Sequence, residues 1–427
     1  MITSYPEALK FLYDNLPMFQ RLGAAAIRKD LTNTIKLCDI LGNPQRKIKT
    51  IHVAGTNGKG STCHMLASIL QTGGLKTGLY TSPHLKNFTE RIKINGEEVS
   101  PEYVVDFVNL IRPAIEEIHP SFFEITVAMA FDYFAKQGVD VAVIEVGLGG
   151  RLDSTNIITP LVSVITNISW DHKDLLGDTL PLIAKEKAGI IKRRVPVVIS
   201  ERQQEVADVF LRKATEEDAE IFFASDHYRA ARSESALTLF NASDEPVLPS
   251  IRLPLHGIYQ MRNLPGVIKT VDVLRQHFPF SDEMIKKGLE DTIANTGLKG
   301  RWQILRSEPT VVCDTAHNEA GIREVLLQIS NCDFDRLFFV LGIVRDKDVS
   351  QILAMMPTNA SYYFCQPKIP RAMDALTLQR EALAFELRGE VIRDVNEAKR
   401  KAISTAAAND FVFIGGSTYV VAELDEL

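Results

Sequence analysis

Residues 48–61, IKTIHVAGTNGKGS, decide the fold. The apolar run 48–54 predicts a buried strand, and the pattern that starts at Gly60 predicts the helix that follows it. The glycine-rich turn GTNGKGS (55–61) lies between them, so its backbone N–H groups can point at one anion while the helix N-terminus adds positive potential. The turn is predicted to bind phosphate, although Gly60 separates Lys59 from Ser61 where the usual loop has Lys followed directly by Ser or Thr. A plain tight turn is the alternative.

The alternation of strand and helix continues along the chain. Apolar runs of strand length occur at 76–82, 139–147, 161–169 and 195–200. Helical spacing occurs at 103–117, 122–136 and 179–191. Runs such as VDVAVIEVG are typical of strands buried on both faces of a parallel sheet. The pattern therefore predicts an α/β fold with a doubly wound, mostly parallel sheet built from βαβ units.

A second series of strands and helices follows. Short, irregular strands between about residues 221 and 256 predict a small β-rich appendage. The stretch NTGLKG (295–300) is typical of a linker, and strand-length runs recur after it. We therefore expect two domains. Residues 1–297 would form a phosphate-binding domain with an N-terminal helical segment and the appendage, and residues 298–427 a smaller, Rossmann-like α/β domain.

Composition and charge limit the classes of protein to which the chain can belong. Its 427 residues are 45% hydrophobic and 24% charged, which excludes a disordered or fibrous protein, and the net charge of −6 argues against a general nucleic-acid binder. The N-terminal stretch lacks the pattern of a signal peptide, and no apolar stretch has the roughly 20 residues that a membrane helix needs. Five widely spaced cysteines without a CxxC favour a cytoplasmic location. No large apolar surface is suggested, so we expect a monomer.

Polar side chains occur near the ends of several predicted strands. Ser82 ends one strand, Glu145 lies near the end of another, and His172 comes soon after a third. Because ligands bind outside the carboxyl ends of parallel strands, these groups could hold a divalent cation that bridges ATP phosphates. Ser82 and His172 could equally be caps or surface groups. The carboxylate of Glu145, within an apolar run, requires a cation or another partner.

Several other residues have a functional and a structural interpretation. Lys187 lies with other lysines in a helical segment, where a solvated helix face is the simpler interpretation. Arg151 and Asp153 lie on a glycine-rich loop that could contact a ligand or be structural. Asp314 and His317 lie at a strand-to-helix turn, where a helix N-cap is the alternative. Arg301 could reach phosphates or be a surface cation.

Taken together, these motifs resemble those of a known family. They are GTNGKGST, TSPHL with TERI, EVGLGGRLDSTN, ISWDH, EKAGIIK, GR (300–301), DTAHN and GGS (415–417), in this order from about residue 48 onward. The set resembles the folylpolyglutamate synthase/dihydrofolate synthase family of the ATP-dependent Mur ligase superfamily.

The resemblance implies a reaction and its ligands. ATP would phosphorylate a carboxylate of dihydropteroate or a reduced folate, and L-glutamate would then attack the acyl phosphate to form an amide. Mg²⁺ and ATP would be required, and residues 1–297 and 298–427 would be the ATP-binding and the glutamate-ligase domains. Both activities, dihydrofolate synthase and folylpolyglutamate synthase, are expected.

The resemblance also implies roles for residues. The ATP phosphates would be held by Thr56, Asn57, Gly58, Lys59, Gly60 and Ser61, with further ATP contacts from Asn263, Arg301 and Asp314. Mg²⁺ would be held by Ser82, Glu145 and His172, and Lys187 matches a lysine that family members carry as a carbamate. The pterin pocket would include Phe123, Glu124, Leu152, Asp153 and Ser154, and the incoming glutamate would lie near His317 and Ser417. Lys59, Lys187, Asp314 and His317 would be catalytic.

The chain departs from the family pattern in three places. Residues 30–33 read DLTN where the family usually has GLER, Glu319 replaces the proline of AHNP, and Tyr259 stands where a histidine is common. None of these positions lies in the phosphate- or metal-binding motifs.

Two other functions remain as alternatives. A peptidoglycan-precursor ligase of the Mur type commonly carries an N-terminal UDP-sugar domain, for which the roughly 47 residues before the first strand are too few. A nucleotide-binding regulator would need the phosphate loop but not Glu145, His172, Lys187 and Asp314 together.

Overall fold

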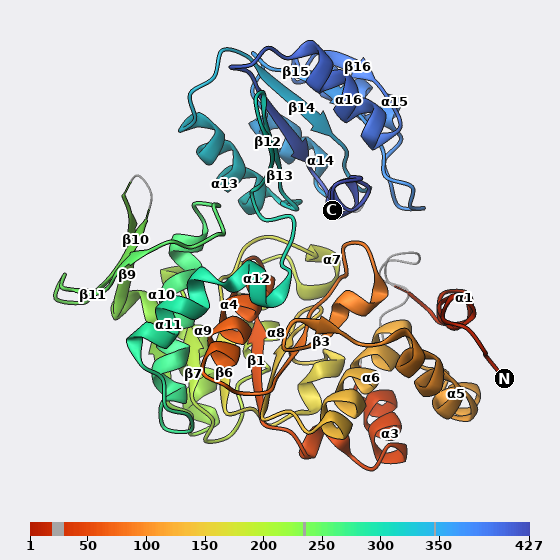
Figure 1. Cartoon of the computed structure of the whole chain (residues 1–427), viewed down its shortest axis with the longest axis vertical. Coiled ribbons are helices and arrows are strands. Elements are labelled where there is room, and N and C mark those ends of the chain that lie inside the picture. Colours follow the sequence, from red (N-terminus) through yellow and green to blue (C-terminus); the bar gives the residue numbers. More distant parts are fainter. Residues whose placement is uncertain (19–29, 234–235, 346) are drawn as a thin grey trace. The chain divides into compact units, whose positions relative to one another are not determined.

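The computed structural model describes residues 1–18, 30–233, 236–345 and 347–427, so parts of the predicted N-terminal segment (19–29) and of the appendage (234–235) lie outside the described residues. The chain forms two compact units. The first comprises Met1–Ser169, Lys173–Pro254 and Gln260–Gly297, and the second comprises Trp170–His172, Leu255–Tyr259 and Leu298–Leu427. Each unit is built around its own sheet (Figure 1).

The sheet of the first unit has the strand order β4-β3-β2-β5-β1-β6-β7-β8. Its strands are β1 (Thr50–Ala54), β2 (Thr77–Tyr80), β3 (Ile92–Ile94), β4 (Glu97–Glu98), β5 (Val141–Glu145), β6 (Val162–Ile165), β7 (Val197–Ile199) and β8 (Ile221–Phe223). Strand β3 pairs antiparallel with both β2 and β4, and the other strand pairs of this sheet are parallel. Because β1 pairs in parallel with both β5 and β6, the loops after these three strands leave the same edge of the sheet.

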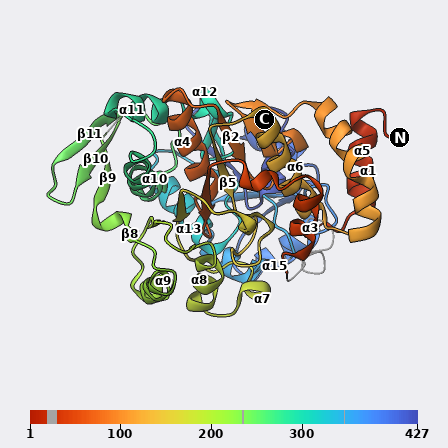
Figure 2. The same ribbon diagram turned by 90° about the horizontal axis from the view of Figure 1, so that it is seen from below.

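Helices cover both faces of this sheet (Figure 2). On one face α4 (Lys59–Thr72) contacts β2 and β5, and α10 (Gln260–Leu274) contacts β6 and β7. On the other face α6 (Phe122–Gln137) packs on the side chains of Tyr80 and Ile144. The remaining helices of this unit are α1 (Tyr5–Asn15), α3 (Thr32–Ile40), α5 (Pro101–Ile118), α7 (Lys173–Leu176), α8 (Leu180–Ala188), α9 (Gln204–Glu216), α11 (Asp282–Glu290) and α12 (Thr292–Thr296).

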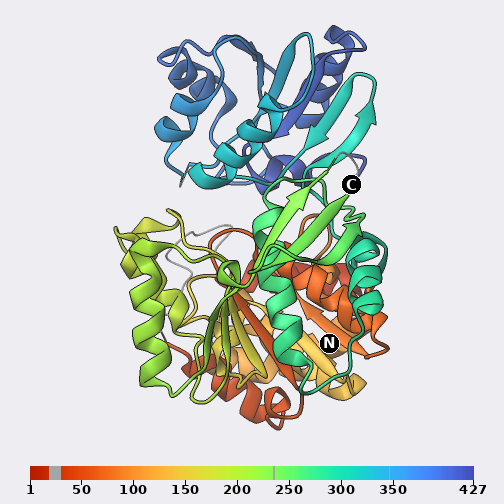
Figure 3. The same cartoon turned by 90° about the vertical axis from the view of Figure 1, so that its left-hand side faces the viewer.

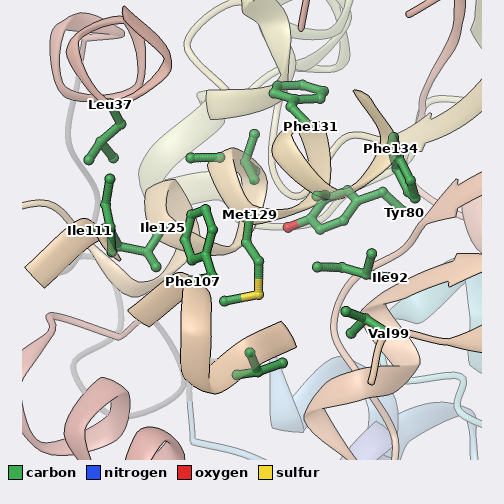
Figure 4. Close-up of a cluster of buried hydrophobic side chains, with 14 of the residues drawn as sticks. Leu37, Tyr80, Ile92, Val99, Phe107, Ile111, Ile125, Met129, Phe131 and Phe134 are labelled. Atoms are coloured by element: carbon green, nitrogen blue, oxygen red, sulfur yellow. The ribbon is translucent and has the colours of Figure 1, made fainter. Parts of the chain in front are cut away.

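A large apolar core lies between α6 and the sheet. Figure 4 shows Tyr80, Ile92 and Val99 gathered with Phe131 and Phe134 of α6 in one cluster. The Tyr80 hydroxyl is satisfied inside this core, 3.0 Å from Thr126 Oγ1. Burying each of these aromatic rings contributes about 1.5–3 kcal/mol to stability. The core therefore provides a rigid base for the loops at the edge of the sheet.

The β-rich appendage is smaller than predicted. Strand β8, at the start of the predicted range 221–256, extends the main sheet by pairing in parallel with β7. Only β9 (Tyr228–Arg232), β10 (Leu237–Asn241) and β11 (Pro246–Ile251) form a separate antiparallel sheet, which packs against α10 and α11 (Figure 3). The run IFF is too short to show from its own pattern which sheet it joins.

The second unit has the strand order β12-β13-β17-β14-β15-β16, with β12 antiparallel to its neighbour. Its strands are β12 (Gln303–Ser307), β13 (Thr310–Cys313), β14 (Leu337–Leu341), β15 (Ser361–Phe364), β16 (Gly389–Val391) and β17 (Phe411–Gly415). Its helices are α13 (Glu319–Ser330), α14 (Val349–Met355), α15 (Ala375–Leu383), α16 (Val395–Thr405) and α17 (Thr418–Ala422). The predicted fold class, a doubly wound α/β unit followed by a smaller α/β unit, is confirmed. Of the helices described, none is long and apolar enough to cross a lipid bilayer.

Candidate active site

The glycine-rich loop follows β1 directly and is held against the end of β6. Thr56 N–H donates to the carbonyl of Asn167 at 2.8 Å, and Asn57 N–H donates to Asn167 Oδ1 at 3.1 Å. The hydroxyl of Thr166 donates to the carbonyl of Asn57 at 2.5 Å. Because these two N–H groups are used within the protein, the N–H groups that remain for an anion are those of Gly58 and of the first turn of α4.

Two lysine ammonium groups meet at this loop. Lys59 Nζ lies 3.1 Å from the carbonyl oxygen of Gly55 and 3.0 Å from that of Thr56. Lys187 Nζ, from α8, lies 2.9 Å from the same Gly55 oxygen, and its side chain is only 4% exposed. Two like charges this close repel each other in a medium of low dielectric constant. Both ammonium groups meet at one backbone oxygen of the loop.

Residues of helix α10 pack against the glycine-rich loop. Asn263 Oδ1 lies so close to Gly58 that a Cβ atom at position 58 would come within 2.3 Å of it, and Gly58 has a φ of 85°. Asn263 Nδ2 donates to Gln260 Oε1 at 2.8 Å, and Gln260 Nε2 donates to the hydroxyl of Ser61 at 3.1 Å. The structure therefore brings the predicted residue Asn263 directly against the phosphate loop.

Ser82 and Glu145 also meet at this edge of the sheet. The backbone N–H of Ser82 donates to Glu145 Oε2 at 3.0 Å. Glu145 is the last residue of β5, lies opposite Val53 of β1, and is 5% exposed. A buried carboxylate with a hydroxyl-bearing neighbour suits a divalent cation.

The loop after β5 determines where Lys187 lies. Arg151 N–H donates to the carbonyl of Glu186 at 2.8 Å, and its guanidinium pairs with the Glu186 carboxylate at 2.9 Å. The backbone of Gly150 packs so closely on α8 that a Cβ atom there would lie 2.9 Å from the carbonyl oxygen of Lys187. The motifs GLGGR and EKAG therefore pack directly against each other, and Arg151 has a structural role in this contact.

Among the predicted pterin-pocket residues, three are buried and two are partly exposed. Glu124 caps α6 by accepting from the Ser121 N–H at 2.6 Å. Asp153 accepts from Leu148 N–H at 2.8 Å and from Thr155 N–H at 3.0 Å, and burial raises the pKa of its carboxyl group. Ser154 is also buried, whereas Phe123 and Leu152 keep partial exposure. A ligand contact by Glu124 or Asp153 would have to share oxygens that already accept hydrogen bonds.

In the second unit, Asp314 lies just after β13 and is almost completely buried. Its Oδ2 accepts from Trp302 N–H at 2.7 Å and from the hydroxyl of Tyr259 at 2.6 Å. The guanidinium of Arg301 donates to the carbonyl of Gly300 and to the hydroxyl of Thr315. Arg301 and Asp314 are neighbours, since burial raises the pKa of Asp314 and the charge of the Arg301 guanidinium acts against that rise.

His317, His172 and Lys347 surround Asp171. Lys347 Nζ lies 2.5 Å from Asp171 Oδ1, while His317 Nε2 lies 3.6 Å from Oδ2 and His172 Nε2 lies 3.7 Å from Oδ1. Asn318, the N-cap of α13, donates to Oδ2 at 3.0 Å. Burial alone would raise the pKa of Asp171, but the His317 hydrogen bond and the neighbouring cations outweigh it and hold that pKa well below its usual range.

The predicted magnesium set is divided between the two units. Ser82, Glu145 and Lys187 belong to the first unit, whereas His172 belongs to the second. In the part of the chain that the structure describes, no group of three or more His, Cys, Asp or Glu side chains could hold a metal ion. This finding does not test the predicted magnesium set, because that set includes a serine and a lysine.

Ser417 caps a helix. Its hydroxyl accepts from Tyr419 N–H at 3.1 Å at the start of α17, and its side chain is buried.

Three residues of the candidate site were not predicted from the sequence: Gln260, Asp171 and Lys347. Gln260 had a usable signal, because it lies one helical turn before Asn263. Lys347 had none, because its partner lies 176 residues away.

Family comparisons cover most of the chain. The Mur ligase middle domain matches residues 53–271, and the glutamate ligase domain of Mur ligases matches residues 300–418. A dihydrofolate synthase/folylpolyglutamate synthase of Bacillus subtilis is 33% identical over 445 residues, covering 99% of each chain. A probable bifunctional folylpolyglutamate synthase/dihydropteroate synthase of Haloferax volcanii is 35% identical over 98% of this chain, which spans about half the length of that relative (50%).

Solved structures show the same likeness. Escherichia coli FolC in complex with DHPP and ADP superposes with a TM-score of 0.87 at 28% identity, covering 98% of this chain and 96% of that one. A bifunctional folylpolyglutamate synthase/dihydrofolate synthase with Mn, AMPPNP and L-glutamate bound superposes with a TM-score of 0.84 at 28% identity, covering 98% and 97%.

Proposed function

Because this chain belongs to the dihydrofolate synthase/folylpolyglutamate synthase family of Mur ligases, we propose that it is an ATP-dependent ligase that forms an amide with L-glutamate. Its acceptors are dihydropteroate, which becomes dihydrofolate, and reduced folates, which gain glutamate residues. Structures of relatives that hold ADP, AMPPNP, Mn or L-glutamate support ATP and Mg²⁺ as its co-substrate and metal.

The proposed reaction has two steps. A carboxylate is a poor electrophile, so one of its oxygens first attacks the γ-phosphorus of ATP, and ADP leaves. The amino nitrogen of L-glutamate then attacks the carbonyl carbon of the acyl phosphate, phosphate leaves, and the nitrogen loses a proton to give the amide. Both steps bring anions together, so cationic side chains and N–H donors must offset the charge that develops.

One observation carries the proposal: Lys59 and Lys187 converge on the carbonyl oxygen of Gly55, at the N-terminus of α4. We assign the N–H groups from Gly58 to Ser61, with the Lys59 ammonium, to the ATP phosphates. Asn263 keeps this loop in shape from α10. The N–H groups at the start of α4 and the Lys59 ammonium fit a polyphosphate better than a neutral ligand.

The residues present also fit a magnesium ion. Glu145 and Ser82 lie at the same edge of the sheet as the two lysines, and we assign them to the ion, together with His172. When bound, Mg²⁺ neutralises charge on the phosphates. We assign Lys187 as a carbamate, because this modification replaces one of two crowded ammonium groups by an anion.

The two predicted domains are assigned different tasks. Residues 1–297 bind ATP and the pterin, with Phe123 and Leu152 as the partly exposed pocket residues. Residues 298–427 supply Arg301 and Asp314 to ATP, and His317 and Ser417 lie near L-glutamate. The five free cysteines fit the reducing cytoplasm, and we expect a monomer.

The central experiment measures ATP-dependent incorporation of labelled L-glutamate into dihydropteroate and into a reduced folate, assayed separately. Turnover of both is expected. Turnover of neither would contradict the proposal, and turnover with a UDP-muramoyl acceptor would replace it by a peptidoglycan-precursor ligase.

Lys187 is tested by Lys187→Ala, with Lys185→Ala as the matched control, since Lys185 is exposed on the same helix. We expect the first variant to lose turnover and to regain part of it with added short carboxylates. Lys185→Ala should behave like the unaltered protein. Unchanged turnover in Lys187→Ala would remove this lysine from the site.

A further inference from the structure

Tyr259 stands where the family commonly has a histidine, and its hydroxyl donates a hydrogen bond to the buried carboxylate of Asp314. It lies at the end of the segment Leu255–Tyr259, which is part of the second unit. Ile258 N–H donates to Gln328 Oε1 at 2.8 Å, and Gln328 Nε2 donates to the carbonyl of His256 at 2.9 Å, so α13 fixes this segment. The backbone is thereby set so that the Tyr259 hydroxyl reaches Asp314 at 2.6 Å.

The carboxylate of Asp314 has room for one more donor. A carboxylate offers about four lone-pair positions. On Oδ2, two are taken by Trp302 N–H and the Tyr259 hydroxyl, and on Oδ1 one is taken by Ala316 N–H at 2.8 Å. Oδ1 is therefore the oxygen that can still accept a hydrogen bond from a ligand.

Tyr259 differs from the other two donors. Trp302 and Ala316 donate from the main chain, so among the hydrogen bonds recorded for the described residues the phenol is the one side-chain donor to Asp314. It is also the one donor that a substitution can delete without moving the backbone.

The electrostatics agree with this geometry. Burial raises the pKa of Asp314, and the hydrogen bond from Tyr259 and the charge of Arg301 act against that rise. Burial also raises the pKa of Tyr259 well above its usual value, so the phenol keeps its proton and remains a donor. Burial also raises the pKa of the adjacent Cys313 thiol, to about 12, so this neighbour stays neutral.

We infer that Tyr259 is a positioning residue for nucleotide binding: its hydroxyl occupies Asp314 Oδ2 and so presents Oδ1 to a hydroxyl or amino donor of ATP. The inference rests on the proposed function for the role of Asp314. Without the phenol, a buried carboxylate oxygen loses a donor, and the carboxylate can turn away or take up a proton.

The test compares Tyr259→Phe with Tyr228→Phe. Tyr228 donates to Asp272 Oδ2, also at 2.6 Å, but lies on β9, outside both candidate ligand-binding edges. Affinity for AMPPNP with Mg²⁺ is measured by calorimetry without folate or glutamate, and KM and kcat for ATP are measured by glutamate incorporation. Tyr259→Phe should weaken AMPPNP binding and raise KM for ATP by about tenfold, with a smaller change in kcat. Tyr228→Phe should change neither.

Two readouts separate positioning from simple packing. The acid limb of kcat/KM for ATP should move to higher pH in Tyr259→Phe, by about one unit, because the ionised carboxylate has lost a donor. Tyr259→His, which restores a ring N–H donor, should recover most of the affinity. Unchanged AMPPNP affinity and an unshifted acid limb in folded Tyr259→Phe would overturn the inference. Since binding is measured without the acceptor, a failure of the ligase assay alone would count against the proposed function instead.

Discussion

The two units place polar groups at the same kind of position, the carboxyl edge of a parallel sheet, but they assemble them differently. In the first unit a single contiguous loop supplies the N–H donors and Lys59, with Lys187 added from α8. In the second unit the groups around Asp314 and Asp171 come from segments that lie far apart along the chain. The arrangement also differs, because lysines and backbone N–H groups of the first unit converge on one loop, whereas groups of the second unit are arranged around the carboxylates of Asp314 and Asp171.

This contrast shows what a local motif can do. A contiguous loop binds an anion through its own backbone, so its chemistry is visible in seven residues. A carboxylate such as Asp171 has a function only through partners brought to it by the fold. Substitutions in the first unit should therefore remove a function, and those in the second should weaken one.

The largest expected effect is that of Lys59→Ala. Removing the ammonium group takes away the cation that contacts the carbonyls of both Gly55 and Thr56, and we expect ATP turnover to fall by about a thousandfold or more while the fold persists. The measurement is glutamate incorporation, with circular dichroism to verify folding. A folded variant with a near-normal rate would show that ATP turnover does not require Lys59, and that a substitution in the contiguous loop does not remove a function.

A second expected difference concerns acid stability. His52 and His84, both in the first unit, are buried, and burial lowers the pKa of each to about 3. Their unfolded pKa is about 6.5, so the unfolded state binds more protons between these values. The contribution of these two histidines to the free energy of unfolding is therefore fully present above about pH 6.5. It falls as the pH decreases below that value, by about 1.4 kcal/mol per pH unit for each histidine.

Urea denaturation as a function of pH measures this slope. His52→Gln should flatten it, and His277→Gln, at an exposed position, should leave it unchanged. An equal slope in His52→Gln would show that this histidine does not drive acid unfolding.

Much of the fold could be predicted because buried parallel strands have a continuous apolar pattern. Strands β1, β5 and β6 were expected from such runs and are present, as is the helix after the glycine loop. Strands β3 and β4 were not predicted, because they are very short and owe their conformation to pairing with β2 and each other. For the same reason β8 was assigned to the appendage rather than to the main sheet.

The candidate site divides in the same way. Lys59 and Glu145 follow from motif and position, and Asn263 follows from the family resemblance. The structure places Lys59 and Glu145 at the edge of the first sheet and Asn263 against the glycine-rich loop there. Tyr259 was visible only as a departure without consequence, because its partner Asp314 lies 55 residues further along. Pairwise contacts between distant segments have no signature in a single sequence.

Asp171→Asn tests the second unit with an intermediate effect. The amide keeps the shape of the side chain but removes the charge that holds Lys347 and His317. We expect KM for L-glutamate to rise by about tenfold, with KM for ATP and the Mg²⁺ dependence within about twofold of the unaltered protein. Asp174→Asn, at an exposed position nearby, is the control. A dominant loss of Mg²⁺ dependence would instead place Asp171 with the metal.

The smallest effect is expected for Ser417→Ala, and it decides between two roles of one hydroxyl. The structure shows this hydroxyl capping α17, and losing such a cap costs about 1 kcal/mol. If capping is its main task, thermal stability should fall, KM for L-glutamate should change less than about threefold, and Ser417→Thr should restore stability, because threonine keeps the acceptor oxygen. A tenfold rise in KM at unchanged stability would mean that the hydroxyl contacts the substrate. In that case the second unit too would hold part of its chemistry in a short contiguous motif, GGS, and the contrast between the two units would narrow.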